Sequence, residues 1–88
     1  MDELTQCREE IDRIDAQMIA LFERRMAVAC EIAEIKKRTD MPVLQTGREK
    51  AVLAKCREQL KDKALWPSAE KFMQYIMQLS REEQNRRI

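Results

Sequence analysis

Seven polar side chains lie on or beside stripes of the sequence that are otherwise apolar at helical spacing. Four are cations, one is an acid and two are neutral hydrogen-bonding groups: Arg8, Arg25, Lys36, Arg48, Glu49, Ser80 and Gln84. Arginine and lysine bind anionic groups, and the planar fork of arginine favours two-point contacts with carboxylates. The chain has no histidine, so a Ser-His-Asp or Cys-His mechanism is impossible within one chain. These residue types predict a cationic cavity that binds an anion.

Arg25 is the strongest of these signals because it interrupts a long apolar repeat. The repeat advances in alternating steps of three and four residues, which is typical of a helix seam packed against other helices. Its members are Leu4, Cys7, Ile11, Ile14, Met18, Leu21, Arg25, Val28, Ile32 and Ile35. A guanidinium group stays charged, so its burial requires a negative partner. That partner is either an acid on the same helix, in a buried salt bridge, or an anionic ligand.

The composition predicts one all-α domain covering residues 1–88. A single glycine, two prolines and many strong helix formers are typical of a helical protein. Charged residues make up 38% of the chain but the net charge is only +1, which argues against a general grip on nucleic acid. No apolar run approaches the ~20 residues of a membrane span, and there is no glycine-rich phosphate loop. We therefore expect no nucleic-acid partner and no membrane attachment.

Three cysteines, Cys7, Cys30 and Cys56, lie far apart in the sequence. They lack the paired spacing of a zinc site, so we expect no metal. Cys7 and Cys56 fall on apolar stripes and are predicted to be small core residues. An odd number of cysteines without a signal-peptide pattern indicates a reducing, cytoplasmic location.

The first helix is predicted to run from about Leu4 to Arg38, because no glycine or proline interrupts this stretch. It would be roughly 50 Å long, whereas a compact globule of this size is about 30 Å across. The apolar seam continues along the whole helix, so the overhanging part needs a cover. A second copy of the chain is the simplest cover. We expect three helices per chain in an intertwined helical homodimer.

Two shorter helices follow a loop over residues 39–45, in which Pro42 disfavours helical backbone at the residue before it. Thr46 and Glu49 fit a capping box, and a second helix is predicted from there to about Lys61. Its inward residues are Val52, Leu53, Cys56 and Leu60. The pair Trp66-Pro67 marks the start of the third helix. Its inward stripe comprises Ala69, Phe72, Met73, Ile76 and Met77, and continues to the polar Ser80 and Gln84.

The spacing of the cations favours a site shared between two chains. Arg25 and Lys36 are three helical turns apart, so they point the same way about 16 Å from each other. Arg8 is roughly 25 Å from Arg25 along the same helix, too far for one small ligand to touch both. In an antiparallel helix pair, Arg8 of one copy would instead approach Arg25 of the other.

Each of these residues also has an ordinary structural interpretation. Arg8 could pair with Asp12 on the helix surface, and Lys36 could simply complement the dipole at a helix C-terminus. Glu49 could serve only in the capping box, and the two polar residues of the third stripe could be solvated at a frayed helix end. Composition and spacing alone therefore reach a helical dimer with a shared, cationic, anion-binding cavity.

The chain resembles the all-α class of chorismate mutases from about Leu4 to Gln84. Residues 4–15 resemble the family's opening R-x-x-I-D-x-I-D, residues 21–26 its L-x-x-R-M/R segment and residues 35–37 its K-x turn. Residues 42–49 resemble its P-V-x-D-x-x-R-E loop, with Gln45 in place of the aspartate, and Ser80-x-x-x-Gln84 closes the pattern. No single segment is specific, but all five in this order are.

The resemblance implies the rearrangement of chorismate to prephenate, a concerted step in one substrate that requires no cofactor. It implies that Arg25, and Arg8 of the partner subunit, clamp the substrate carboxylates. Lys36 and Gln84 would donate to the ether oxygen as its C–O bond breaks. Glu49 would accept a hydrogen bond from the ring hydroxyl, and Arg48 and Ser80 would make supporting contacts around the substrate carboxylates and the loop.

Two other functions are consistent with such a helical chain. A related isochorismate pyruvate-lyase shares the fold and the cationic site. Glu49 favours the mutase, because the related lyases have an apolar residue at this position. A non-catalytic helical dimerisation module is the alternative from outside the enzymes.

Overall fold

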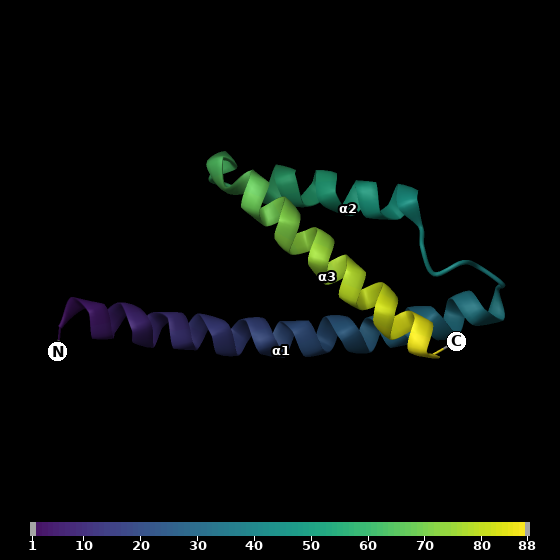
Figure 1. Cartoon of the computed structure of the whole chain (residues 1–88), viewed down its shortest axis with the longest axis horizontal. Coiled ribbons are helices and arrows are strands. Elements are labelled where there is room, and N and C mark those ends of the chain that lie inside the picture. Colours follow the sequence, from purple (N-terminus) through teal and green to yellow (C-terminus); the bar gives the residue numbers. More distant parts are fainter. Residues whose placement is uncertain (1, 88) are drawn as a thin grey trace.

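The computed structural model describes residues 2–87 and contains three α-helices (Figure 1). They are α1 (Glu3–Arg38), α2 (Thr46–Gln59) and α3 (Trp66–Arg87), with a short 3₁₀ turn, η1 (Lys63–Leu65), before α3. The predicted all-α class with a long first helix is confirmed. With 36 residues, α1 is about 54 Å long.

Both ends of α1 are specified by local side chains. The Oδ1 atom of Asp2 accepts a 2.7 Å hydrogen bond from the backbone N–H of Thr5 and caps the N-terminus. Three basic residues, 36–38, occupy the last turn, where positive charge complements the helix dipole. The helix ends before Asp40, which adopts the left-handed region at φ 56°, a conformation that aspartate tolerates better than most residues.

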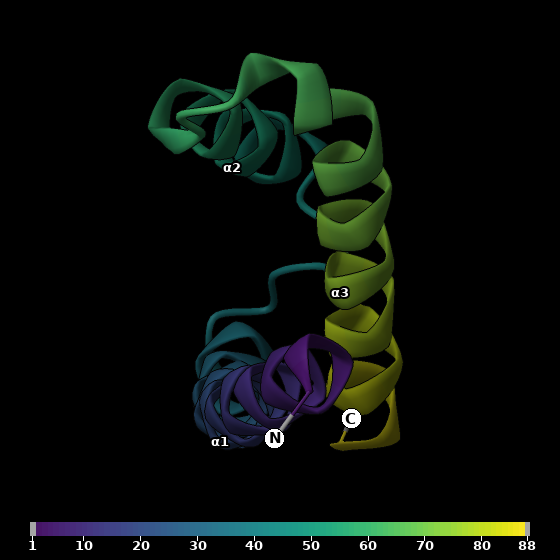
Figure 2. The ribbon, with the colours of Figure 1, turned by 90° about the vertical axis from the view of Figure 1, so that its left-hand side faces the viewer.

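Helix α3 packs against both of the other helices. It packs against α1 through its C-terminal half and against α2 through its start, whereas α1 and α2 lie apart (Figures 1 and 2). Ala29 and Ala33 of α1 are buried together with Met77 of α3. The small alanine side chains let α3 approach α1 closely, because interhelical distance depends on the side chains at the contact.

The chain is too open to form a compact globule alone. Its radius of gyration is 16.3 Å, whereas a compact chain of this length has a value near 12 Å. The predicted seam of α1 lies beside the face that packs on α3 and is uncovered in one chain. Eight of its apolar residues are 39% to 58% exposed, namely Leu4, Ile11, Ile14, Met18, Leu21, Val28, Ile32 and Ile35.

Several local predictions are corrected by the structure. Thr46 is not an N-cap: α2 already includes it, Gln45 is the capping residue, and its side chain makes no capping hydrogen bond. Helix α2 ends at Gln59 rather than near Lys61. The predicted core residue Cys7 is exposed in the single chain.

The third helix also differs in part from its predicted inward stripe. Phe72 is 52% exposed, and Ala69, Met73 and Ile76 are only half-buried, because α3 has neighbours on limited parts of its length. Met77 at the α1 contact is buried as predicted. A single chain thus has little core of its own.

Candidate active site

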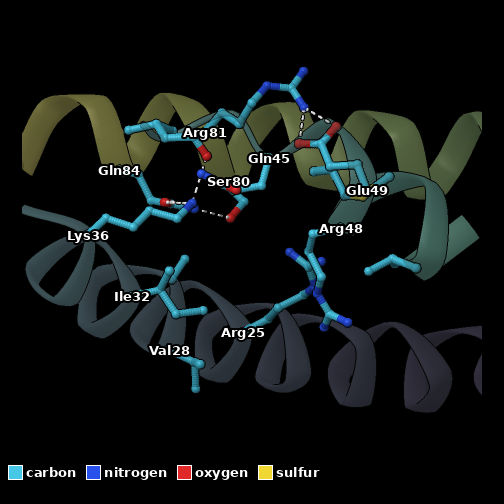
Figure 3. A pocket seen from close by; sticks show the side chains of 14 residues that line it. Arg25, Val28, Ile32, Lys36, Gln45, Arg48, Glu49, Ser80, Arg81 and Gln84 are labelled. Carbon is cyan, nitrogen blue, oxygen red and sulfur yellow. Dashed lines mark hydrogen bonds and ion pairs between the residues drawn. The ribbon is translucent and has the colours of Figure 1, made fainter. Parts of the chain in front are cut away.

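A cavity of about 430 Å³ lies between α1, the loop over residues 39–45, α2 and α3 (Figure 3). Six of the seven predicted site residues line it: Arg25, Lys36, Arg48, Glu49, Ser80 and Gln84. Apolar side chains from α1, α2 and α3 complete the lining, including Val28, Ile32, Val52 and Met77. A cavity of this volume, apolar with a few convergent polar groups, suits a small metabolite.

Lys36 crosses from α1 to the loop and to α3. Its Nζ donates to the backbone carbonyl of Val43 at 2.6 Å and to Oε1 of Gln84 at 2.9 Å. Burial lowers the pKa of Lys36 below its usual value of 10.5, and attraction to Glu49 partly opposes that effect. An ammonium group has three N–H bonds, so one remains for a ligand.

Ser80 and Gln84 are buried polar residues on α3, 8% and 6% exposed. Their interpretation as solvated residues at a frayed helix end is therefore wrong. Nε2 of Gln84 donates to the Ser80 hydroxyl at 3.2 Å, while Oε1 accepts from Lys36. The amide nitrogen carries two hydrogens, so Gln84 keeps one donor after Ser80 has taken the other. The network fixes the side chain of a residue that lines the cavity and leaves this donor without a partner among residues 2–87.

Arg25 from α1 and Arg48 from α2 extend toward each other across the open side of the cavity (Figure 3). Neither arginine has an ion pair with another residue in the described range 2–87. The buried salt bridge considered for Arg25 is thus not formed within the described chain. Two converging guanidinium groups without a carboxylate between them constitute a favourable position for an anion.

Glu49 is held by a residue that the sequence did not single out. One terminal nitrogen of Arg81 contacts both carboxylate oxygens of Glu49, at 2.6 and 2.5 Å. The pair joins α2 to α3 at the wall of the cavity (Figure 3). Glu49 therefore does not complete a capping box with Thr46, because its carboxylate faces a cation on α3 instead.

Two further lining residues were not predicted as site residues. The Val43 carbonyl accepts from Lys36, and Gln45 lines the cavity while its Nε2 donates to the Pro42 carbonyl at 2.8 Å. No sequence signal marks a backbone carbonyl. In the sequence, Gln45 differs from the aspartate of the family pattern and gives no other signal.

Arg8 is the predicted site residue that lies away from this cavity. It is exposed on the N-terminal part of α1, and the structure gives it no ion pair with Asp12 within residues 2–87. Arg8 and Arg25 are seventeen residues apart on one continuous helix, or about 25 Å. Within a single chain these two arginines cannot touch one small ligand.

Two other kinds of site are absent from the part of the chain that is described. Residues 2–87 contain no cluster of three or more cysteine, aspartate or glutamate side chains that could hold a metal ion. In the same range, no helix is sufficiently long and apolar to span a bilayer.

The fold and the cavity define a helical protein whose three helices converge on a small cationic binding site. The chain belongs to the family described as chorismate mutase type II, whose sequence model matches residues 7–85. No solved structure matches the chain significantly.

Three curated relatives are similar over part of the chain. A bifunctional chorismate mutase/prephenate dehydratase of Aquifex aeolicus is 38% identical over 55 residues, covering 62% of this chain and 15% of that protein. The T-protein of Enterobacter agglomerans is 33% identical over 57 residues, covering 65% and 15%. A chorismate mutase of Methanocaldococcus jannaschii is 31% identical over 62 residues, covering 70% and 63%. The matched region is thus a small part of the first two relatives and under two thirds of the third.

Proposed function

We propose that this chain is a chorismate mutase domain that rearranges chorismate to prephenate in aromatic amino-acid biosynthesis. This proposal rests on one observation: a single cavity contains arginines without ion partners next to a buried network of hydrogen-bond donors. Arg25 and Arg48 have no ion partner among the described residues, and Lys36 and Gln84 each keep a free donor beside them. Membership of the type II family supports the substrate.

The reaction needs geometry and electrostatics rather than a nucleophile. Chorismate carries two carboxylates, and its C–O bond breaks while a C–C bond forms in the same molecule. Arg25 and Arg48 bind carboxylate, which holds the flexible side chain of the substrate folded over its ring. Lys36 and Gln84 donate to the ether oxygen, where negative charge develops as the bond breaks. Glu49 accepts a hydrogen bond from the ring hydroxyl, and Ser80 orients Gln84.

We further propose that the active form is a homodimer. One chain exposes 7221 Å², whereas a compact monomer of this mass exposes about 5,400 Å². The excess of roughly 1,800 Å² per chain is the size of an obligate interface. The uncovered apolar seam of α1 supplies a surface suited to that burial, because eight of its large residues are exposed in the single chain.

An antiparallel pairing of two α1 helices would complete the site with Arg8 of the partner subunit. A register that matches the apolar seam with itself pairs Leu4 with Val28, Ile11 with Leu21, and Ile14 with Met18. It places Arg8 within one residue, about 1.5 Å along the helix, of the position opposite Arg25. A single register thus buries the seam and adds a cation to the open side of the cavity. This coincidence supports two shared sites per dimer.

Three free cysteines, Cys7, Cys30 and Cys56, suit a reducing compartment. We propose the cytoplasm as the location of the domain on this basis.

Incubation of the purified chain with chorismate, followed by nuclear magnetic resonance of the products, tests the proposal. The expected product is prephenate, an isomer of chorismate with no loss of mass. A parallel incubation with isochorismate tests the lyase, which would release pyruvate. If neither substrate is consumed by a folded dimer, the chain is a dimerisation module and the proposed activity is wrong.

A further inference from the structure

Among the described residues 2–87, Glu49 is the single carboxylate that lines the cavity, and it lies there with four cations. Those cations are Arg25, Lys36, Arg48 and Arg81. Opposite charges attract over several ångströms in a partly desolvated site, and attraction between Glu49 and Lys36 already contributes to the titration of the lysine. An untethered Glu49 side chain would therefore pair with a cation that the substrate needs.

Arg81 is placed to prevent this. It lies on α3, beside Ser80, and its terminal nitrogen contacts both oxygens of Glu49, at 2.6 and 2.5 Å. The two residues also line a second, more open cavity of about 500 Å³ on the outer side of α2 and α3. The ion pair thus lies between the two cavities, and the Arg81 guanidinium sits beside the Glu49 carboxylate, apart from the Lys36 amine (Figure 3).

A purely structural role explains this pair poorly. The side chains of Arg81 and Glu49 are 30% and 25% exposed, and ion pairs accessible to water contribute little to folding. A second arginine pair on the same helix offers a comparison: Arg87 contacts Glu83 at 3.3 Å on the surface, away from the cavity. The Arg81 pair differs from it in lining the cavity of the proposed active site.

We infer that Arg81 is a positioning residue that tethers the Glu49 carboxylate to the cavity wall and keeps it away from the substrate-binding cations. This inference rests on the proposed function, because it assumes that those cations receive the carboxylates of chorismate. Each oxygen of the tethered carboxylate keeps acceptor capacity beyond its contact with Arg81, which would serve the ring hydroxyl. The effect of Arg81 on the reaction passes through Glu49 and requires no contact with the substrate.

The test is a cycle of three variants, Arg81→Met, Glu49→Gln and the double variant, each assayed for kcat and KM with chorismate. In Arg81→Met the freed carboxylate competes with the substrate for Lys36 and the two arginines, so KM should rise about tenfold and more than kcat falls. In the double variant no carboxylate is left to compete. Its KM should return to within about threefold of the value for Glu49→Gln alone.

Arg87→Met is the matched control, because it removes a surface arginine of α3 that also pairs with an acid. It should leave both kinetic constants at the parent values. Thermal melting of all variants reports on folding. If Arg81→Met does not fold, Arg81→Gln also removes the charge while keeping a polar side chain, and the same expectation holds for it.

Suppression of the KM defect by Glu49→Gln distinguishes the tether from a packing role, which the second substitution would not repair. The inference is overturned if Arg81→Met has the parent KM, or if the two single defects simply multiply in the double variant. An active parent with either result leaves the proposed function intact. A folded dimeric parent that does not consume chorismate overturns the proposed function and the tether together.

Discussion

Replacement of Lys36 by methionine should lower kcat far more than it raises KM. The Nζ atom has two partners, the Val43 carbonyl at 2.6 Å and Gln84 Oε1 at 2.9 Å, which leave its third N–H for the ether oxygen of the proposed substrate. In the transition state that oxygen gains negative charge, whereas in the ground state it is nearly neutral. The interaction is therefore stronger in the transition state, which is the condition for an effect on kcat.

The size of the effect follows from the distance. A full charge about 3 Å from an ammonium group gains roughly 5.5 kcal/mol at an effective dielectric constant of about 20. If about half a charge develops, the gain is roughly 2.8 kcal/mol, which is about a hundredfold in rate. Losing one preorganised donor in other enzymes costs about 10²–10³ in kcat, so the two estimates agree.

The assay is the initial rate of chorismate loss, measured over a range of substrate concentrations. Lys37→Met is the matched control, because Lys37 is an exposed neighbour in the same basic turn, and it should have the parent kinetics. Melting temperatures show whether the lost contact to Val43 loosens the loop. If Lys36→Met keeps its kcat and only KM rises, the lysine is a ground-state clamp and the reasoning about the ether oxygen is wrong.

Three further outcomes follow from the same geometry. Burial holds the pKa of Lys36 below its usual value of 10.5, so the positive charge of Lys36 should be lost as pH rises through that lowered pKa. In a pH–rate profile, kcat/KM should therefore fall at a lower alkaline pH than the titration of an ordinary lysine would give. In Gln84→Glu, the new carboxyl group donates a hydrogen bond only when protonated, and Lys36, whose Nζ lies 2.9 Å from Oε1 of Gln84, favours the ionised form. The activity of this variant should therefore rise about tenfold per pH unit as pH falls. A pH profile as flat as the parent's would place Gln84 away from the reacting oxygen. Ile14→Asp puts a charge at the middle of the exposed seam, where burial of an unpaired charge costs several kcal/mol; sedimentation should find an inactive monomer, and an active dimer would contradict the seam as the interface.

The helices were predictable because their signals are local. No glycine or proline interrupts residues 3–38, and the predicted start of α1 at Leu4 is within one residue of the observed start at Glu3. Trp66-Pro67 marks the start of α3 as predicted. The capping box failed for a tertiary reason. Glu49 fits that motif by spacing, but a folded chain offers its carboxylate the guanidinium of Arg81, which sequence spacing does not show.

Residues of the candidate site were predictable where a polar side chain falls on an apolar helical stripe. Ser80 and Gln84 interrupt an apolar stripe, and both are buried at the cavity. Arg81 gave no such signal, because a charged residue on a helix near its end is ordinary and its partner lies 32 residues away. The role of Arg8 stays a prediction, since its proposed contacts belong to a second chain.

Complementation between inactive variants tests most directly whether two chains share each site. Arg8→Ala and Arg25→Ala should each be nearly inactive, because every site in either homodimer lacks one clamp. After equal mixing and subunit exchange, about half of the dimers are heterodimers with one intact site, so about a quarter of the parent activity should return.

The control is a chain that carries both substitutions, mixed equally with the parent. If sites are shared, its heterodimers have one lesion in each site, so only about a quarter of the parent activity should remain, from parent homodimers. Sites contained within single chains predict the opposite pair of results. Arg8→Ala would then be active by itself, because Arg8 cannot reach the site that contains Arg25 of its own chain, and the parent mixed with the double variant would keep about half of its activity.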